Sequence, residues 1–311
     1  MKRAICFILI CMILCLCAGC GQVSQETVFA MDTVMELKIW GKDADEGVTQ
    51  VKALLSDLEQ TWSVTREASV LSRINSGEAP LLSAQQEQLL ADVQALSVRT
   101  GGAFDPKLLA ASLCWGFQSE VQRVPADDEL AQALIQSKWD LGAAIKGYAG
   151  QQAVTLLEQM EVDYAMLNLG GNVQTYGEKS DGSAWSIGIQ NPDGGDPVGT
   201  LAVNGTACIV TSGDYQRYFE QDGIRYHHIL DPETGRPTQS GLRSVTVICR
   251  DGLTADALST ALFVMGLEEG SAFWRQSDDF EAVFILTSGE IYATEGAALS
   301  GCEYEVIFRE N

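Results

Sequence analysis

The apolar positions of this chain follow different periods in its two halves. In the first half, apolar residues recur at helical spacing between capping residues, and in the second half short apolar runs alternate with turn residues. We predict helices over Asp43–Trp62, Ser83–Thr100, Pro125–Lys138 and Lys146–Met160, preceded by a strand over Val28–Gly41. Later strands are predicted over Tyr164–Leu169, Ala184–Gln190, Thr200–Val203, Ala207–Thr211, Ser244–Cys249, Phe280–Thr287, Glu290–Thr294 and Tyr304–Phe308.

This order of elements predicts the fold class. Helices come early and strands late, without the strict alternation that builds a doubly wound parallel sheet. We therefore expect an α+β fold with mixed, largely antiparallel sheets packed against helices. The chain has no internal repeat and no long linker, so we expect one compact catalytic unit.

The N-terminus has the pattern of an export signal. Lys2 and Arg3 precede an apolar run from Ala4 to Ala18, which is short for a transmembrane span. The segment Cys-Ala-Gly-Cys that ends at Cys20 resembles a bacterial lipobox, although Cys17 stands where Leu is usual. We predict a signal peptide over residues 1–19, a lipidated tether over 20–26 and a folded domain over 27–311, held extracytoplasmically on a membrane by a lipid at Cys20. Plain secretion and an uncleaved anchor remain alternatives.

Cysteine spacing excludes a zinc site or a dense disulfide framework. Five of the nine cysteines lie in the leader, and the others show no CxxC spacing. The scattered cysteines are Cys114, Cys208, Cys249 and Cys302. Cys208 and Cys249 lie in apolar runs and are expected in the core, while one disulfide among the four stays open.

The chain is strongly acidic. Its formal net charge is −22, and loss of Lys2 and Arg3 with the leader makes it −24. Nucleic-acid binding is excluded as a function class, because basic patches supply most of that affinity. An anionic substrate would need a local cation.

One apolar helix, predicted to begin near Thr254, carries Asp256 and Thr260. Residues four apart share a helix face, and a carboxylate on a buried face needs compensation. Converging hard oxygens suit a divalent cation such as Mg²⁺. Alternatively, Thr254 is an N-cap and Asp256 a first-turn acid favoured by the helix dipole. The residue types alone favour neither interpretation.

Two further segments carry candidate chemistry. In DLGAAIKGYAG, Gly142 and Gly147 flank Lys146 at a helix start, an arrangement that suits phosphate but is also that of a glycine-loosened helix start. His227 and His228 are adjacent, so in extended chain at most one points into a given site.

Taken together, these segments resemble the ApbE family of FAD:protein FMN transferases. The resemblance covers nearly all of the chain after the leader and keeps the family's order. It rests on AMDTVME, SVLSRIN, GGAFDP, DLGAAIKGYA, NLGGN, WSIGIQNP, TSGDYQRYF, HHILDPETGRP and DALSTALFVMG. It implies a T-fold-like core and Mg²⁺-dependent transfer of FMN from FAD to a Ser or Thr hydroxyl of a target flavoprotein, with release of AMP. Implied targets are subunits of Nqr or Rnf type.

Residue roles follow from the same resemblance. The side chains of Asp256 and Thr260 and the backbone oxygen of Ala143 match the family's metal ligands, so Asp256 is also expected to be catalytic. His228 matches the histidine thought to assist deprotonation of the acceptor hydroxyl, and it is expected to be catalytic and to contact the cofactor. The positions that match flavin or adenine contacts are Met31, Thr65, Ala103, Phe104, Asp105, Asp140 and Lys146.

Two positions depart from the family pattern. Many relatives have Gly where this chain has Asp32, and many carry an aromatic residue where it has Thr65, near the flavin ring. Loss of that ring is expected to loosen FAD or to shift the balance toward hydrolysis to FMN and AMP. An FAD pyrophosphatase and a non-catalytic flavin-binding lipoprotein are therefore the alternatives.

Overall fold

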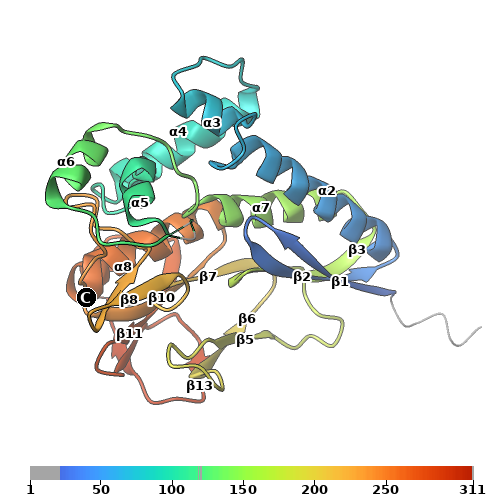
Figure 1. The fold of residues 1–311 in the computed structure, drawn as a ribbon. Helices are drawn as coiled ribbons and strands as arrows, with labels where there is room; N and C mark the ends of the chain where they lie inside the picture. The colour runs from blue at the N-terminus through green and yellow to red at the C-terminus, as the bar shows by residue number, and fades with distance from the viewer. Residues whose placement is uncertain (1–21, 118, 120, 310–311) are drawn as a thin grey trace, which may run out of the picture.

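The computed structural model describes residues 22–117, 119 and 121–309, and it arranges them in layers (Figure 1). One large sheet carries helices α2, α7 and α8 on one side and a small sheet on the other. The helices are α2 (Ala44–Trp62), α3 (Val70–Asn75), α4 (Ala84–Arg99), α5 (Leu109–Trp115), α6 (Asp127–Ile135), α7 (Ile145–Leu157) and α8 (Gly252–Arg275). The strands are β1 (Val23–Ala30), β2 (Thr33–Gly41), β3 (Val162–Leu169), β4 (Asn172–Tyr176), β5 (Trp185–Ile189), β6 (Gly199–Val203), β7 (Ala207–Gly213), β8 (Tyr218–Gln221), β9 (Ile224–His227), β10 (Leu242–Cys249), β11 (Phe280–Leu286), β12 (Ile291–Thr294), β13 (Leu299–Ser300) and β14 (Glu305–Ile307).

Strand pairing is almost entirely antiparallel. In the described part of the chain the large sheet runs β1-β2-β3-β4-β7-β10-β11-β12-β14, and its single parallel pair is β12 with β14. A smaller sheet runs β13-β6-β5, and β8 pairs with β9 in a separate hairpin. The predicted α+β class with largely antiparallel sheets is confirmed.

Three apolar cores hold these layers together. One fills the space between α2, α7 and the β2–β3 part of the large sheet, and a second lies under α8 against β10 and β11. The third lies between the large sheet and the small β13-β6-β5 sheet. Alternation along β5, where Trp185, Ile187 and Ile189 are buried and the residues between them are exposed, shows why this small sheet covers the large one with one face.

The N-terminal strand prediction was incomplete. The run predicted as one strand over Val28–Gly41 forms a hairpin, β1 and β2, that turns at Met31 and Asp32. Residues 23–26, expected to be tether, are the first half of β1 and pair with β2. Their side chains alternate between exposed and half-buried because β1 is the edge strand of the sheet, and this weak burial explains the mistaken prediction.

The remaining N-terminal predictions lie outside the described residues. These are the signal peptide over residues 1–19, the lipid site at Cys20 and the start of the tether. Within the described residues, no helix combines the length and apolar character needed to span a membrane. Cys114, Cys208, Cys249 and Cys302 are all free thiols, so the structure does not form the disulfide that the sequence left open.

Candidate active site

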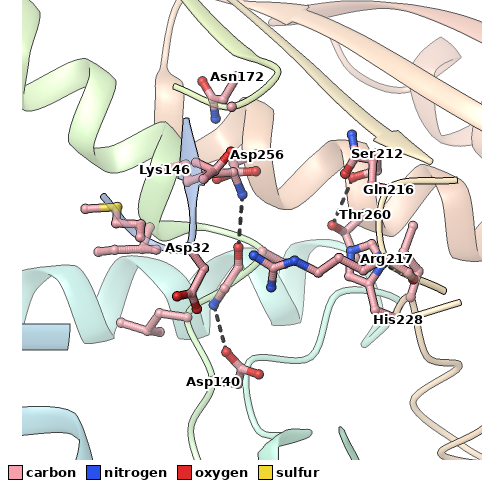
Figure 2. Close-up of a pocket in the computed structure, with 18 of the residues that line it drawn as sticks. Asp32, Asp140, Lys146, Asn172, Ser212, Gln216, Arg217, His228, Asp256 and Thr260 are labelled. Atoms are coloured by element: carbon pink, nitrogen blue, oxygen red, sulfur yellow. Dashed lines mark hydrogen bonds between the residues drawn. The ribbon is translucent and has the colours of Figure 1, made fainter. Parts of the chain in front are cut away.

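A cavity of about 600 Å³ opens where several elements of the large sheet and its helices converge. Its lining includes every residue that was predicted to be catalytic or to bind cofactor or metal, and these residues come from segments far apart in the chain. Figure 2 shows several of them. These residues are Met31, Thr65, Ala103, Phe104, Asp105, Asp140, Ala143, Lys146, His228, Asp256 and Thr260. The structure thus places all of them in one site, and their individual roles stay predictions.

The crossing of α7 and α8 forms one wall of the cavity. Gly147 of α7 faces Gly252 of α8 so closely that a Cβ on Gly147 would collide with the Gly252 carbonyl oxygen and lie 2.7 Å from Cβ of Asp256. The Gly147 N–H donates a hydrogen bond of 2.8 Å to Oδ2 of Asp256. Gly147 is therefore required for helix packing, whereas the sequence had associated it with a phosphate.

The position of Asp256 decides between the two interpretations of its helix. The N-cap of α8 is Asp251, whose carboxylate accepts from the Thr254 N–H at 2.7 Å, so Thr254 is not the cap. The first turn of α8 contains no acid, and Asp256 lies beyond it. Its side chain is 3 % exposed and points to the N-terminus of α7, where unpaired N–H groups favour negative charge. The capping interpretation of Asp256 is wrong.

The donor set around Asp256 fits a hard cation. Within the described residues, no three His, Cys, Asp or Glu side chains come together. Any cation here would therefore need hydroxyl or carbonyl ligands beside the carboxylate. Thr260 follows one turn after Asp256 on the same cavity wall, and Ala143 lines the cavity just before α7. One carboxylate, one hydroxyl and a backbone carbonyl are the oxygen ligands that Mg²⁺ accepts alongside water or phosphate.

The loop before α7 holds an acid and a base close together. Oδ1 of Asp140 accepts from the Gly142 N–H at 2.9 Å, and Nζ of Lys146 donates to the Gly142 carbonyl at 3.3 Å (Figure 2). Burial raises the pKa of Asp140, against the opposing effects of that hydrogen bond and of the positive charges of Arg217 and Lys146. The loop thus presents a lysine ammonium and a carboxyl group to one ligand.

The two histidines have different surroundings, as their adjacency predicted. His227 is buried at the end of β9, and its Nε2 lies 3.1 Å from the Thr238 carbonyl oxygen. His228 lines the cavity, and its Nδ1 lies 3.2 Å from the Arg217 carbonyl oxygen. A carbonyl oxygen only accepts, so Nδ1 carries the hydrogen and Nε2 of the neutral ring keeps a free lone pair.

His228 is held neutral at physiological pH. Burial, the charge of Arg217 and the neighbouring His227 lower the pKa of His228 to about 3. A neutral ring with a fixed tautomer is a proton acceptor, which is the form a general base requires.

The opposite wall of the cavity consists of turns. Met31 and Asp32 form the β1–β2 turn with φ angles of 50° and 58°, a left-handed conformation that non-glycine residues seldom adopt. Oε2 of Glu59 accepts from the Met31 N–H at 3.2 Å, and Arg66 pairs with the other oxygen of Glu59 at 2.9 Å. The resemblance leads us to expect Gly at the position of Asp32, and this φ explains why Gly would suit it.

Sequence reasoning gave no cavity role to several residues that line the site. They are Asp32, Glu59, Asn172, Ser212, Tyr215, Gln216 and Arg217. Most lie between β3 and β4 or at and after the end of β7, in the NLGGN and TSGDYQRYF segments that had been noticed without a role. The strand ends were the available signal, because segments following neighbouring strands tend to meet at one edge.

Comparison with known proteins identifies the family of the chain. The model of the ApbE family matches residues 31–284. The FAD:protein FMN transferase of Klebsiella pneumoniae is 35% identical over 87% of this chain and 92% of its own length, and that of Treponema pallidum is 30% identical over 93% and 92%. The crystal structure of the ApbE protein from Thermotoga maritima, 31% identical, superposes with a TM-score of 0.83 over 88% of this chain and 97% of that one. The flavinyl transferase ApbE of Pseudomonas stutzeri, 29% identical, superposes with a TM-score of 0.78 over 89% of this chain and 96% of that one. The chain belongs to the ApbE family.

Proposed function

We propose that this protein is an Mg²⁺-dependent FAD:protein FMN transferase that moves FMN from FAD to a Ser or Thr hydroxyl and releases AMP. The observation that carries the proposal is the convergence of all the candidate residues on one cavity. Its volume of about 600 Å³ falls within the range of roughly 300–1,000 Å³ that is usual for small-molecule sites. The transferase names of the relatives support the same reaction class.

The charge of the cavity supports a cation. Among the described residues, its lining holds the carboxyl groups of Asp32, Glu59, Asp105, Asp140 and Asp256 but, besides His228, only two basic side chains, Lys146 and Arg217. A pyrophosphate placed there meets more negative than positive charge. Asp256, Thr260 and the Ala143 carbonyl would hold Mg²⁺, which when bound neutralises phosphate oxygens and the charge that develops during transfer.

The protein's own groups supply the remaining parts of the reaction. Lys146 and Arg217 line the cavity, and in this proposal they bind phosphate oxygens and hold the pyrophosphate near the α7 N-terminus. Nε2 of His228 takes the proton of the acceptor hydroxyl as its oxygen bonds to the FMN phosphorus and the bond to the AMP oxygen breaks. A negatively charged substrate raises the proton affinity of His228 when it binds.

One observation favours hydrolysis of FAD as a second activity. Thr65 is exposed at the cavity edge, where its hydroxyl lies 3.0 Å from that of Ser63. A small polar side chain there leaves room for water to reach the site in place of a protein hydroxyl. FAD pyrophosphatase activity, giving FMN and AMP, is therefore the alternative outcome of the same chemistry.

The sequence also supports a location and a partner. We propose that Cys20 carries the lipid anchor and that the domain works outside the cytoplasmic membrane. Its acceptor would be a flavoprotein subunit of Nqr or Rnf type on the same side.

One assay tests the reaction. The full chain in detergent is incubated with FAD, Mg²⁺ and an acceptor protein that carries a Ser/Thr-Gly-Ala-Thr-type site. Fluorescent labelling of the acceptor on a denaturing gel supports transfer, whereas free FMN and AMP without labelling support hydrolysis. Bound FAD with neither product contradicts both activities.

The assignment of His228 as the base has its own test. His228→Ala should slow labelling of the acceptor by roughly 10²–10⁴-fold, as expected for a lost general base, with little change in FAD affinity. A variant that labels the acceptor at the normal rate contradicts this role.

A further inference from the structure

Three hydroxyl groups connect the candidate cation site to the backbone of its own helix. Oγ of Ser212, on β7, lies 3.3 Å from Oγ1 of Thr260 and 2.8 Å from Oγ of Ser259. Oγ of Ser259 donates to the backbone carbonyl of Asp256 at 2.8 Å. Figure 2 shows Ser212 and Thr260 facing each other across the cavity wall.

The three hydroxyl groups form a hydrogen-bonded series that ends at the Asp256 carbonyl. This carbonyl determines which hydroxyl donates in each hydrogen bond of the series. The Asp256 carbonyl only accepts, so the single hydroxyl hydrogen of Ser259 is used there. Ser259 then accepts from Ser212, and Ser212 in turn has only lone pairs left for Thr260. The hydroxyl hydrogen of Thr260 therefore points to Ser212, which leaves the lone pairs of the Thr260 oxygen available.

We propose that Ser212 is a positioning residue that, with Ser259 behind it, makes the Thr260 hydroxyl oxygen a fixed acceptor for a divalent cation. A hydroxyl that coordinates a cation must turn its hydrogen away from it. The serine chain does so before the cation arrives, which removes the cost of reorienting the hydroxyl. The inference deepens the proposed function, since it rests on Asp256 and Thr260 as cation ligands.

Burial supports a positioning role for the chain. Ser259 is fully buried at 0% exposure on the apolar face of α8, where an alanine would pack without any polar group to satisfy. A second hydroxyl pair begins one position away on β7, at Thr211, which also lines the cavity. Oγ1 of Thr211 and Oγ1 of Thr246 form a 2.8 Å hydroxyl pair between β7 and β10, and Thr246 does not line the cavity.

That neighbouring pair supplies the matched control. The full chain in detergent, without FAD, is titrated with Mn²⁺ alone, and free Mn²⁺ is counted by electron paramagnetic resonance. Ser212→Ala should weaken Mn²⁺ binding by about 10-fold, the usual effect of losing a group that orients a metal ligand. Thr246→Val breaks a hydroxyl pair of the same length and should leave Mn²⁺ affinity within about 2-fold of the native value.

Two further variants separate orientation from simple packing. Ser212→Thr keeps the hydroxyl and should restore most of the Mn²⁺ affinity. Ser259→Ala frees the Ser212 hydrogen to turn toward Thr260, so it should also weaken binding. The double variant, Ser212→Ala with Ser259→Ala, should bind Mn²⁺ no more weakly than Ser212→Ala, because both changes interrupt the same series of hydrogen bonds. Thermal unfolding without metal checks that each variant folds.

Asp256→Asn separates failure of this inference from failure of the cation assignment. If Asp256→Asn loses Mn²⁺ binding while Ser212→Ala binds like the native chain, the positioning role is wrong and the cation site stands. If Asp256→Asn binds Mn²⁺ normally, the assignment of the cation site is wrong, and the positioning role of Ser212 is then wrong as well. Equal losses in Ser212→Ala and Thr246→Val also contradict the inference, since they indicate a general effect of sheet packing.

Discussion

The two walls of the cavity are built differently. The α7–α8 wall is formed by helices in backbone contact at Gly147 and Gly252, and its carboxylate, Asp256, is buried and hydrogen-bonded across the crossing. The facing wall is formed by the Met31–Asp32 turn and the segment after the β8–β9 hairpin, where most side chains are half-buried or exposed. The first wall depends on close packing and the second on turn conformation.

This difference suggests that the two walls have different functions. Phosphate and cation chemistry needs groups held within fractions of an ångström, and a close-packed helix crossing provides such rigidity. Recognition of a flavin and admission of an acceptor protein need an accessible surface, which turns provide. Substitutions in the helical wall should therefore be costly, and those in the Met31–Asp32 turn should act mildly.

The largest effect is expected at the carboxylate of the helical wall. Asp256→Asn keeps an oxygen that accepts from the Gly147 N–H but removes the charge, so the fold should persist while the rate of FMN transfer in Mg²⁺ falls by about 10³-fold or more. Initial rates of acceptor labelling measure the loss, and urea unfolding serves as the control for folding. Full activity in Mg²⁺ would show that Asp256 is not a cation ligand.

The next largest effect should come from the helix crossing itself. Gly147→Ala places a methyl group against the Gly252 carbonyl and 2.7 Å from Cβ of Asp256, so the helices must separate. We expect a loss of about 3 kcal/mol in the free energy of unfolding, the upper end of the usual cost of overpacking. Urea denaturation measures it.

Gly142→Ala is the matched control for that substitution. Its new Cβ would lie 3.0 Å from a carboxylate oxygen of Asp140, a side-chain terminus that can move. The free energy of unfolding should change by less than about 1 kcal/mol. Equal losses at Gly142 and Gly147 would show that the crossing is no more rigid than the loop before it.

An intermediate effect is expected from His228 at low pH. Its pKa is about 3 in the folded chain and near 6.5 when unfolded, so between these values the unfolded chain binds a proton that the folded chain does not. The stability that this contributes is complete above pH 6.5 and is lost as the pH falls toward 3.

His228→Asn removes that titration and keeps a donor for the Arg217 carbonyl. Over this pH window, its free energy of unfolding should fall less steeply than that of the native chain, by on the order of 1 kcal/mol per pH unit. Parallel curves for the two proteins, measured by urea unfolding at each pH, would contradict the low pKa.

The smallest effect is expected in the turn wall. Asp32→Gly removes the backbone strain of a non-glycine residue with φ 58°. Glycine also raises the conformational entropy of the unfolded chain, so the free energy of unfolding should rise by only about 0.5 kcal/mol. Removal of one negative charge from the cavity should tighten FAD binding slightly, as fluorescence quenching would show. Asp222→Gly, with φ 55° in the β8–β9 turn away from the cavity lining, should give the same stability gain without the change in affinity. A fall in stability in both variants would contradict the strain argument.

Local sequence patterns predicted the elements with strong caps or long apolar faces. The helix expected over Ser83–Thr100 is α4, with Ser83 as its N-cap in a capping box, and α7 begins one residue before the predicted Lys146. The family and the enzyme class were also recognised from the sequence and are confirmed. Helices α3 and α5 were missed because they are too short to show a helical period, and the β8–β9 hairpin was missed because few of its residues are buried.

The contacts that shape the site could not be predicted from local sequence patterns. In the sequence, Gly147 and Gly252 each look like a glycine of an ordinary turn or helix end. The close contact between them depends on tertiary packing. The same contact explains the error at Thr254, because Gly252 already belongs to the helix and Asp251 caps it. A glycine near a helix start is usually interpreted as part of a turn, whereas here it admits a second helix.

The position of β1 determines how far the enzyme reaches. The strand begins at Val23, and the Gln22 carbonyl already accepts from the Gly41 N–H at 2.9 Å. With the proposed lipid on Cys20, about two residues, at most roughly 7 Å of chain, separate the anchor from the folded domain. If Cys20 carries the proposed lipid, so short a connection would confine the enzyme to the lipid surface and make it select acceptors by their distance from the bilayer. Only a protein whose hydroxyl lies within a domain's height of the membrane would be flavinylated.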